Sequence, residues 1–341
     1  MHDQDCHIIV QTGFIGDIAL NMFLIQELRI AKPHDKIIFL TTPAGAEIAK
    51  AYPKLINKIL IFDKRGEHSG FNGLIHMIRT IRAVKAGTIL SLHQSFRTGS
   101  MLAFSKIPIR IGYKGASLSF MLTDRFPHRK GIHEIEKQRL LLKGIDPDIL
   151  PLAQFQRGLY LREKNNAYNP LKEQTIVIAP GSVWETKKWP AEHFHQLISI
   201  LLAETSHVIT LIGSANDAEI CASIIPKEHK GRVLNLAGTM SLNQTISYLE
   251  QSALLIANDS APIHLASLVN CPTIAIFGPT HPAFGFGPLS DQSIIMQKDL
   301  DCRPCSIHGQ ISCPLGTHAC MQEIMPREIA DQALKYLFSH A

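Results

Sequence analysis

The sequence lacks long apolar runs. Its longest, such as LISILLA at 197–203, falls far short of the about 20 residues that a membrane-spanning helix needs. The N-terminal segment MHDQDC is polar and acidic, and it has neither the charged region nor the apolar region of a signal peptide. We therefore expect a cytoplasmic protein whose contact with any membrane is peripheral.

The sequence also lacks a large net charge and long runs of basic residues. The chain has 34 Lys and Arg against 29 Asp and Glu, which gives a formal net charge of +5. No run of Lys or Arg resembles a nucleic-acid-binding patch, and the net charge is too small to argue for DNA. A mildly basic balance suits phosphate-bearing small molecules or an anionic membrane surface. We therefore expect no nucleic-acid partner.

Two ligand motifs are incomplete or misplaced. The stretch QTGFIGD (11–17) follows the first strand-like run with G-x-x-G spacing, whereas an NAD-dependent oxidoreductase needs the full G-x-G-x-x-G fingerprint. D-x-D occurs at Asp3/Asp5 and at Asp146/Asp148, but neither pair follows a strand, as a magnesium–diphosphate site would require. The sequence thus disfavours dinucleotide chemistry and predicts no metal.

The cysteine count is seven, an odd number, and four of the cysteines cluster near the C-terminus. Their spacing, C-x2-C-x7-C-x6-C, leaves three interpretations: packing of reduced thiols, a tetrahedral zinc site or redox pairing. The zinc interpretation carries a rival function, a non-catalytic zinc-binding regulator. The four residues are Cys302, Cys305, Cys313 and Cys320.

What the sequence does contain is a regular alternation of apolar strand-like runs with helix-like segments. Such alternation predicts an α/β fold with parallel sheets. It is interrupted once, by the proline-containing GIDPDILPLAQFQ (144–156), so we predict two doubly wound domains, 1–155 and 156–341. For the last helix, 326–338, one option is that it packs back on the N-terminal domain.

Polar residues follow several of the predicted strands, at the edge where doubly wound sheets bind ligands. After TIVIA (175–179) come Ser182, Lys187 and Lys188. The lysines are a counter-charge for a diphosphate or, alternatively, a solvated surface pair. In the first domain, Asp17 lies at the start of the helix that follows the first strand. Its structural alternative is a helix N-cap.

The richest such turn is LIANDSAPIH (255–264). We expect Ser260 to cap the next helix, whose free N–H groups form an anion site. Asp259 would repel a phosphate there, so we assign it to sugar hydroxyls instead. His264 lies on the first helical turn, where it could donate to an oxygen, or it is simply a satisfied, half-buried histidine.

Together these motifs resemble glycosyltransferase family 9, the ADP-heptose:lipopolysaccharide heptosyltransferases, and most of all the type II members. The resemblance covers nearly the whole chain, and the order and spacing of the motifs make it specific. It is carried by GFIGD (13–17), SFRTG (95–99), RIGYKG (110–115), PGSVWETKKWP (180–190), NDSAPIHLAS (258–267), FGPTHP (277–282) and the cysteine tail.

The resemblance implies a GT-B fold, in which two Rossmann-like domains face each other across a cleft. It implies inverting transfer of the second heptose from ADP-heptose to the inner core of lipopolysaccharide. The N-terminal domain would bind the lipid-linked acceptor, and the C-terminal domain would bind the nucleotide-sugar. It further implies a monomer without a cofactor, at the cytoplasmic face of the inner membrane.

The resemblance also assigns roles to residues. The catalytic base falls on Asp17, acting across the cleft from Lys187, and Gly16, Ser95 and Arg97 fall on the acceptor side. A ribose ligand falls on Asp217 or Glu219, between which the sequence does not choose. The donor site falls on Ser182, Lys187, Lys188, Asp217, Met240, Asp259, Ser260, Ala261 and His264.

Two departures from the family pattern bear on specificity. The family usually has glycine where this chain has Ala261, so a side chain there would narrow the approach of the donor. In the acceptor region, ASLSFML (116–122) replaces Arg and Leu residues that are common in the family. Another family 9 transferase, with a different nucleotide-sugar or a polysaccharide acceptor, is therefore the nearest rival.

Overall fold

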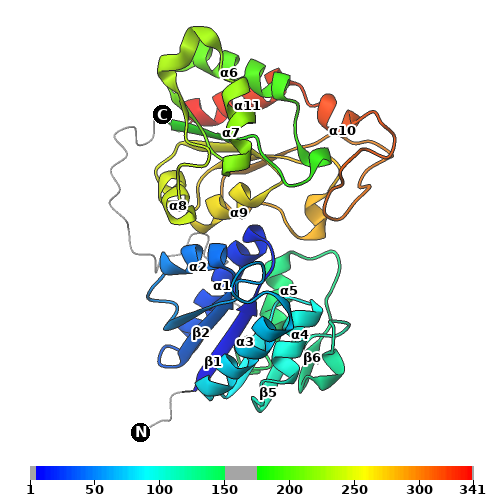
Figure 1. The fold of residues 1–341 in the computed structure, drawn as a ribbon. Coiled ribbons are helices and arrows are strands. Elements are labelled where there is room, and N and C mark those ends of the chain that lie inside the picture. The colour runs from blue at the N-terminus through cyan, green and yellow to red at the C-terminus, as the bar shows by residue number, and fades with distance from the viewer. Residues whose placement is uncertain (1–4, 150–174, 340–341) are drawn as a thin grey trace. The chain divides into compact units, whose positions relative to one another are not determined.

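The computed structural model of the chain describes residues 5–149 and 175–339. The chain divides into two compact units, Met1–Glu163 and Lys164–Ala341, which are coloured blue to teal and green to red in Figure 1. The predicted boundary between residues 155 and 156 lies outside the described residues. The expected α/β class with two doubly wound parallel sheets is confirmed.

The N-terminal unit is built on a six-stranded sheet in the order β3-β2-β1-β4-β5-β6. All neighbouring strands run parallel, and β1 lies between β2 and β4. The chain reverses its direction of winding between β1 and β4, where doubly wound sheets bind ligands. The strands are β1 (Cys6–Gln11), β2 (Lys36–Thr41), β3 (Lys58–Ile61), β4 (Thr88–Ser91), β5 (Ile109–Tyr113) and β6 (Asp124–Phe126).

Helices connect these strands and cover the sheet. Helix α1 begins after the glycine-containing turn at 12–14 and is held to α5 by an ion pair between Glu27 and Arg139. Proline and threonine start α2, where the Thr42 hydroxyl accepts from the Gly45 N–H at 3.1 Å. The helices are α1 (Ile15–Ala31), α2 (Pro43–Lys50), α3 (Gly70–Val84), α4 (Phe96–Ala103) and α5 (Glu134–Leu142).

The C-terminal unit repeats this design with a sheet ordered β12-β11-β10-β7-β8-β9. Its winding reverses between β7 and β10, which pair in parallel with Ala179 opposite Ala257. The two units therefore each have a switch point, and the carboxyl ends of four adjacent strands, β10, β7, β8 and β9, form one row. The strands are β7 (Thr175–Ala179), β8 (Val208–Leu211), β9 (Val233–Asn235), β10 (Leu254–Asn258), β11 (Thr273–Ile276) and β12 (Ser293–Met296).

The helices of this unit are α6 (Ala191–Glu204), α7 (Ala218–Ser223), α8 (Leu242–Glu250), α9 (Ala261–Leu268), α10 (Ala319–Gln322) and α11 (Pro326–Ser339). Helix α11 packs on α6, and its residues Ile329, Ala330 and Ala333 are fully buried in the core of the C-terminal unit. The last helix thus belongs to this core. Within the described ranges, no helix is both long and apolar enough to cross a membrane.

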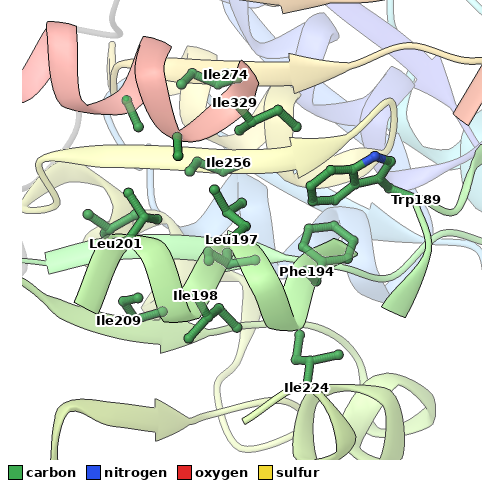
Figure 2. Packing of buried hydrophobic residues seen from close by; sticks show 14 of the residues in the cluster. Trp189, Phe194, Leu197, Ile198, Leu201, Ile209, Ile224, Ile256, Ile274 and Ile329 are labelled. Atoms are coloured by element: carbon green, nitrogen blue, oxygen red, sulfur yellow. The ribbon is translucent and has the colours of Figure 1, made fainter. Parts of the chain in front are cut away.

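The core of the C-terminal unit holds the loop after β7 in place. Figure 2 shows Trp189 and Phe194 beside each other, with Ile256 and Ile274 on the neighbouring strands β10 and β11. The two aromatic rings meet edge to face, with centroids 4.8 Å apart, and the Trp189 Nε1 donates to the Ile324 carbonyl at 3.0 Å. Because Trp189 ends the segment 180–189, its burial anchors the polar residues of that segment.

Candidate active site

The switch point of the C-terminal sheet carries a lysine–aspartate pair. Lys187, in the short 3-10 turn Glu185–Lys187 after β7, places its Nζ 2.6 Å from Oδ2 of Asp259, which follows β10. The side chains are only 12% and 6% exposed. Thr280 Oγ1 donates to the same Oδ2 at 2.6 Å, whereas no described residue bonds Oδ1. Oδ1 is therefore the carboxylate oxygen left for a ligand hydroxyl.

Asn258 fixes the geometry of this pair. Its side chain is fully buried and donates from Nδ2 to the Pro180 carbonyl at 2.8 Å, while its Oδ1 accepts from the Trp189 N–H at 3.2 Å. Both ends of the 180–189 segment are thus tied to the tip of β10. A buried amide that is satisfied in this way specifies one backbone arrangement.

The start of α9 differs in detail from the sequence prediction. Ser260 occupies the N-cap position, but its side chain makes no capping hydrogen bond, so the predicted cap is wrong. Its hydroxyl donates instead to the Gly181 carbonyl, at 3.3 Å, because the β7 turn lies alongside. The first N–H groups of α9 therefore carry no side-chain cap and keep their partial positive charge toward the site.

The next residues of α9 differ in how deeply they are buried. Ala261 is the first helical residue and is half-buried, and Pro262 follows it in the first turn, as predicted. His264 is 5% exposed, which is more buried than either interpretation of the sequence expected, and its ring lies 6.4 Å from that of Phe286. Its contact with a donor remains a prediction.

The two lysines of the 180–190 segment separate. Lys188 is more exposed than Lys187 and pairs with Glu185 at 2.5 Å, as the surface-pair interpretation anticipated for it. The Ser182 hydroxyl is half-buried and accepts from the Trp184 N–H at 3.3 Å. Of the two lysines, only Lys187 is held inside the switch point.

Asp217 and Glu219 also separate. The Asp217 carboxylate closes a capping box, accepting from the Ser214 N–H and hydroxyl at 2.8 and 2.7 Å. It lies so close to the β7 turn that a Cβ on Gly181 would stand 2.3 Å from its Oδ1. Glu219 is exposed on α7. Met240 lies half-buried in the turn after β9, at the end of the same row of strand ends.

Asp17 lies in the first turn of α1, at the switch point of the N-terminal sheet. The N-cap position is Phe14, so Asp17 is the third helical residue and the N-cap interpretation is wrong. Burial raises the pKa of Asp17 to about 6, the negative charge of Glu134 adds to this, and a hydrogen bond from the Phe14 N–H opposes it. Burial thus outweighs the acidifying effect of the helix N-terminus.

Glu134, the first residue of α5, is the charge that faces Asp17. It is 7% exposed, and its Oε2 lies 3.1 Å from Lys137 Nζ and 3.7 Å from His128 Nε2. Tyr113 packs edge to face on His128 and is fully buried, and burial raises the pKa of its hydroxyl. The charge of Glu134 is the second cause, after burial, of the raised pKa of Asp17.

The residues predicted for the acceptor side gather around the same switch point. Gly16 precedes Asp17 in α1, and Ser95 caps α4, where its Oγ accepts from the Thr98 N–H. Arg97 donates to the Lys64 carbonyl, at 3.4 Å, and Lys64 Nζ reaches the Thr12 carbonyl at 2.9 Å. Because β1 and β4 are neighbours, these segments of separate sequence share one edge.

Several residues of these sites carried no signal in the sequence. Lys64 and His93 stand alone in it, and they gain their places through contacts with Thr12, which is 52 and 81 residues away. Glu134 gains its place beside His128 and Lys137. Thr280 lies in the FGPTHP motif, but its contact with Asp259, 21 residues earlier, has no signal in the sequence. The D-x-D at Asp146/Asp148 is a local turn, in which Asp146 accepts the Asp148 N–H and pairs with Lys32.

The cysteine tail offers no ligand set. All seven cysteines are free thiols, and burial raises the pKa of Cys320 to about 11. In residues 5–149 and 175–339, no three His, Cys, Asp or Glu side chains are arranged to hold a metal ion. The thiols of Cys302, Cys305 and Cys313 all act on the pKa of Cys320, and the three interpretations of this cluster stay predictions.

Known proteins share both the sequence pattern and the architecture. The model of the glycosyltransferase family 9 (heptosyltransferase) proteins matches residues 74–314. The lipooligosaccharide heptosyltransferase 2 of Haemophilus influenzae is 25% identical over 309 residues, which cover 85% of this chain and 88% of the relative. The lipopolysaccharide heptosyltransferase 2 of Escherichia coli K12 is 26% identical, with 85% and 87% covered.

Among solved structures, the E. coli ADP-heptose lipopolysaccharide heptosyltransferase II superposes with a TM-score of 0.79 at 20% identity, and 99% of each chain is covered. At that identity the likeness establishes the GT-B fold. The family match extends over more than half of the chain. It includes β4 at the switch point of the N-terminal sheet and β10 at that of the C-terminal sheet. The chain therefore belongs to glycosyltransferase family 9, the heptosyltransferase family, and is a glycosyltransferase.

Proposed function

We propose that this glycosyltransferase moves heptose from ADP-heptose to the inner core of lipopolysaccharide, adds the second heptose, inverts the anomeric centre and uses Asp17 as general base. The type II relatives in Haemophilus and E. coli support the choice of donor and acceptor. The acceptor is lipid-linked, so the enzyme we propose works as a peripheral protein and a monomer at the cytoplasmic face of the inner membrane.

One observation above all supports the base assignment. Asp17 is a half-buried carboxylate at the β1/β4 switch point, and burial together with Glu134 raises its pKa to about 6. A general base works best when its pKa lies near the pH of the reaction. Asp17 is thus ionised at neutral pH and still basic enough to take a proton as the acceptor oxygen bonds to the sugar.

Different residues of the donor site bind different parts of the nucleotide-sugar. Lys187 and the uncapped N–H groups of α9 suit the diphosphate, whose charge grows as the bond from the anomeric carbon to ADP breaks. Asp259 orients Lys187 through Oδ2 and has Oδ1 for a sugar hydroxyl. Asp217 is better placed than Glu219 for the ribose, because it borders Gly181 at the strand edge.

The transfer that follows is a single displacement. The acceptor hydroxyl oxygen attacks the anomeric carbon, its proton passes to Asp17, and ADP leaves from the opposite face with the bonding electrons. A lysine and a helix N-terminus can stabilise that charge without a divalent ion. We therefore propose metal-independent catalysis.

The test is a panel of nucleotide-sugars and core acceptors, read by ADP release. We expect turnover with ADP-heptose and an inner core that already carries one heptose. Turnover only with another nucleotide-sugar, or only with a polysaccharide acceptor, would reject the proposal in favour of the rival family 9 activity. No turnover with any pair would reject it altogether.

A further inference from the structure

His93 lies in the segment between β4 and α4, and its side chain contacts Thr12 in the turn after β1. Its Nδ1 is 3.1 Å from the Thr12 hydroxyl and 3.1 Å from the Thr98 hydroxyl. Ser95 Oγ supports Thr98 at 2.9 Å. Two hydroxyl contacts on one nitrogen fix the plane of the ring, so the opposite edge of the imidazole points in a set direction.

The opposite edge of His93 borders the same small space as the Asp17 carboxylate. A Cβ added to Gly13 would stand 3.3 Å from Asp17 Oδ2 and 3.5 Å from His93 Cδ2. Gln11 Oε1 also borders this space, 2.9 Å from the same Cβ position, and it accepts a hydrogen bond from the Gly13 N–H. In the ring, Cδ2 adjoins Nε2, which has no hydrogen-bond partner among the described residues and is not buried. A polar atom is therefore presented next to the proposed base.

We propose that His93 binds the acceptor sugar, with Nε2–H donating a hydrogen bond to an oxygen adjacent to the hydroxyl that Asp17 deprotonates. The inference rests on the proposed function, to which it adds an acceptor-binding residue. The proposal takes the tautomer in which a threonine hydroxyl donates to Nδ1, so that the neutral ring carries its proton on Nε2. Two neighbouring oxygens of one sugar would then be held by Asp17 and His93, which orients the nucleophile.

The surroundings of His93 favour its neutral form. Burial lowers the pKa of His93, and the positive charge of Lys64 lowers it further. Lys64 is fixed nearby, since its Nζ donates to the carbonyl of Thr12, the residue whose hydroxyl holds the ring. The imidazole therefore acts as a hydrogen-bond donor at neutral pH, and it does not compete with Asp17 for the proton.

Two substitutions separate this role from a structural one. His93→Asn keeps a polar atom near the Nδ1 position and with it the contacts to Thr12 and Thr98, but it deletes the Nε2 edge. His93→Gln places an amide N–H near the Nε2 position. We would measure ADP release from ADP-heptose as the concentration of deacylated inner core carrying one heptose is varied, with melting temperatures for each variant.

We expect His93→Asn to raise the acceptor KM about five- to tenfold, the worth of one hydrogen bond, and to leave the KM for ADP-heptose unchanged. His93→Gln should return the acceptor KM to within about twofold of the wild type. A wild-type acceptor KM in His93→Asn would overturn the inference while the proposed function stands. No turnover by the wild-type enzyme would reject the proposed function, and the inference with it.

Discussion

Lys187 and Asp259 form an ion pair across the switch point of the C-terminal sheet, with Nζ 2.6 Å from Oδ2. The pair links the segment after β7 to the tip of β10, and Thr280 supports it from the loop after β11. Because Lys187 and Thr280 both bind Oδ2, the buried Asp259 carboxylate has one orientation. It therefore positions the Lys187 ammonium before any donor binds.

Lys187→Met should weaken ADP binding by about tenfold to a hundredfold. The substitution keeps the length of the side chain but removes the charge that faces the diphosphate, and it leaves the buried Asp259 carboxylate with Thr280 alone. Isothermal titration calorimetry with ADP measures the effect.

The neighbouring lysine provides the matched control. Lys188→Met removes an exposed lysine that pairs with Glu185, and such pairs contribute little. We expect ADP binding within about twofold of the wild type. Equal losses in the two variants would mean that general positive charge, rather than the fixed Lys187, attracts the nucleotide.

The pH dependence of kcat/KM should show an acid limb with an apparent pKa near 6. Asp17 must be ionised to accept a proton, and its pKa of about 6 means that activity is lost as the pH falls through this value. Glu134 raises the pKa of Asp17, so Glu134→Gln should move the limb to lower pH by up to about one unit. A limb that stays in place would show that Glu134 does not act on the base.

Asp17→Asn should stabilise the protein at neutral pH while it abolishes turnover. The folded protein raises the pKa of Asp17 above that of the unfolded chain, so the stabilising contribution of its protonated form is complete at low pH and is lost as the pH rises through about 6. Asparagine carries no charge and escapes that loss.

We therefore expect a gain on the order of 1–2 kcal/mol at pH 7.5, allowing for partial exposure, that shrinks toward pH 4. Differential scanning calorimetry at the two pH values measures it. A gain of the same size at both would assign the effect to something other than the charge of Asp17.

Trp189→Ala should destabilise the C-terminal unit by about 3–5 kcal/mol, since it empties a site in the core beside Phe194. Trp189→Phe keeps most of the ring and loses the Nε1 hydrogen bond to Ile324, so a cost of about 1–2 kcal/mol is expected. Urea unfolding followed by circular dichroism measures both, and similar costs would contradict the packing argument.

Chelation tests the metal-free mechanism that we propose. With Lys187 and the start of α9 on the leaving group, EDTA should leave the rate within about twofold of its value without chelator. Strong inhibition that added Mg²⁺ or Zn²⁺ reverses would overturn it. A separate measurement of the metal content of the purified protein tests the four-cysteine tail as a metal site.

The order of elements could be predicted from the sequence because buried parallel strands are continuous apolar runs between amphipathic helices. Two strands, β6 and β12, are hard to predict in this way. β6 is the polar segment Asp124–Phe126, and β12, Ser293–Met296, is a half-buried edge strand. β6 has no apolar run, and the apolar run of β12, SIIM, is short.

The site was predicted less completely than the fold. Asp17, Lys187 and Asp259 follow strands, and that position made them candidates, whereas their roles came from the resemblance to family 9. The ion pair between Lys187 and Asp259 could not be predicted, because it depends on the pairing of β7 with β10, whose partner residues are 78 positions apart in the chain. The missing Ser260 cap has the same origin, since its hydroxyl is directed to the neighbouring turn and donates to the Gly181 carbonyl.

The central claim is base-assisted transfer of heptose, and the most direct measurement is ADP release from ADP-heptose and an inner core carrying one heptose, by wild type and by Asp17→Asn. We predict turnover by the wild type, a loss of about a hundredfold or more in Asp17→Asn and nearly unchanged ADP binding in that variant. A fully active Asp17→Asn, or a wild type that releases no ADP with any core acceptor, would contradict the account.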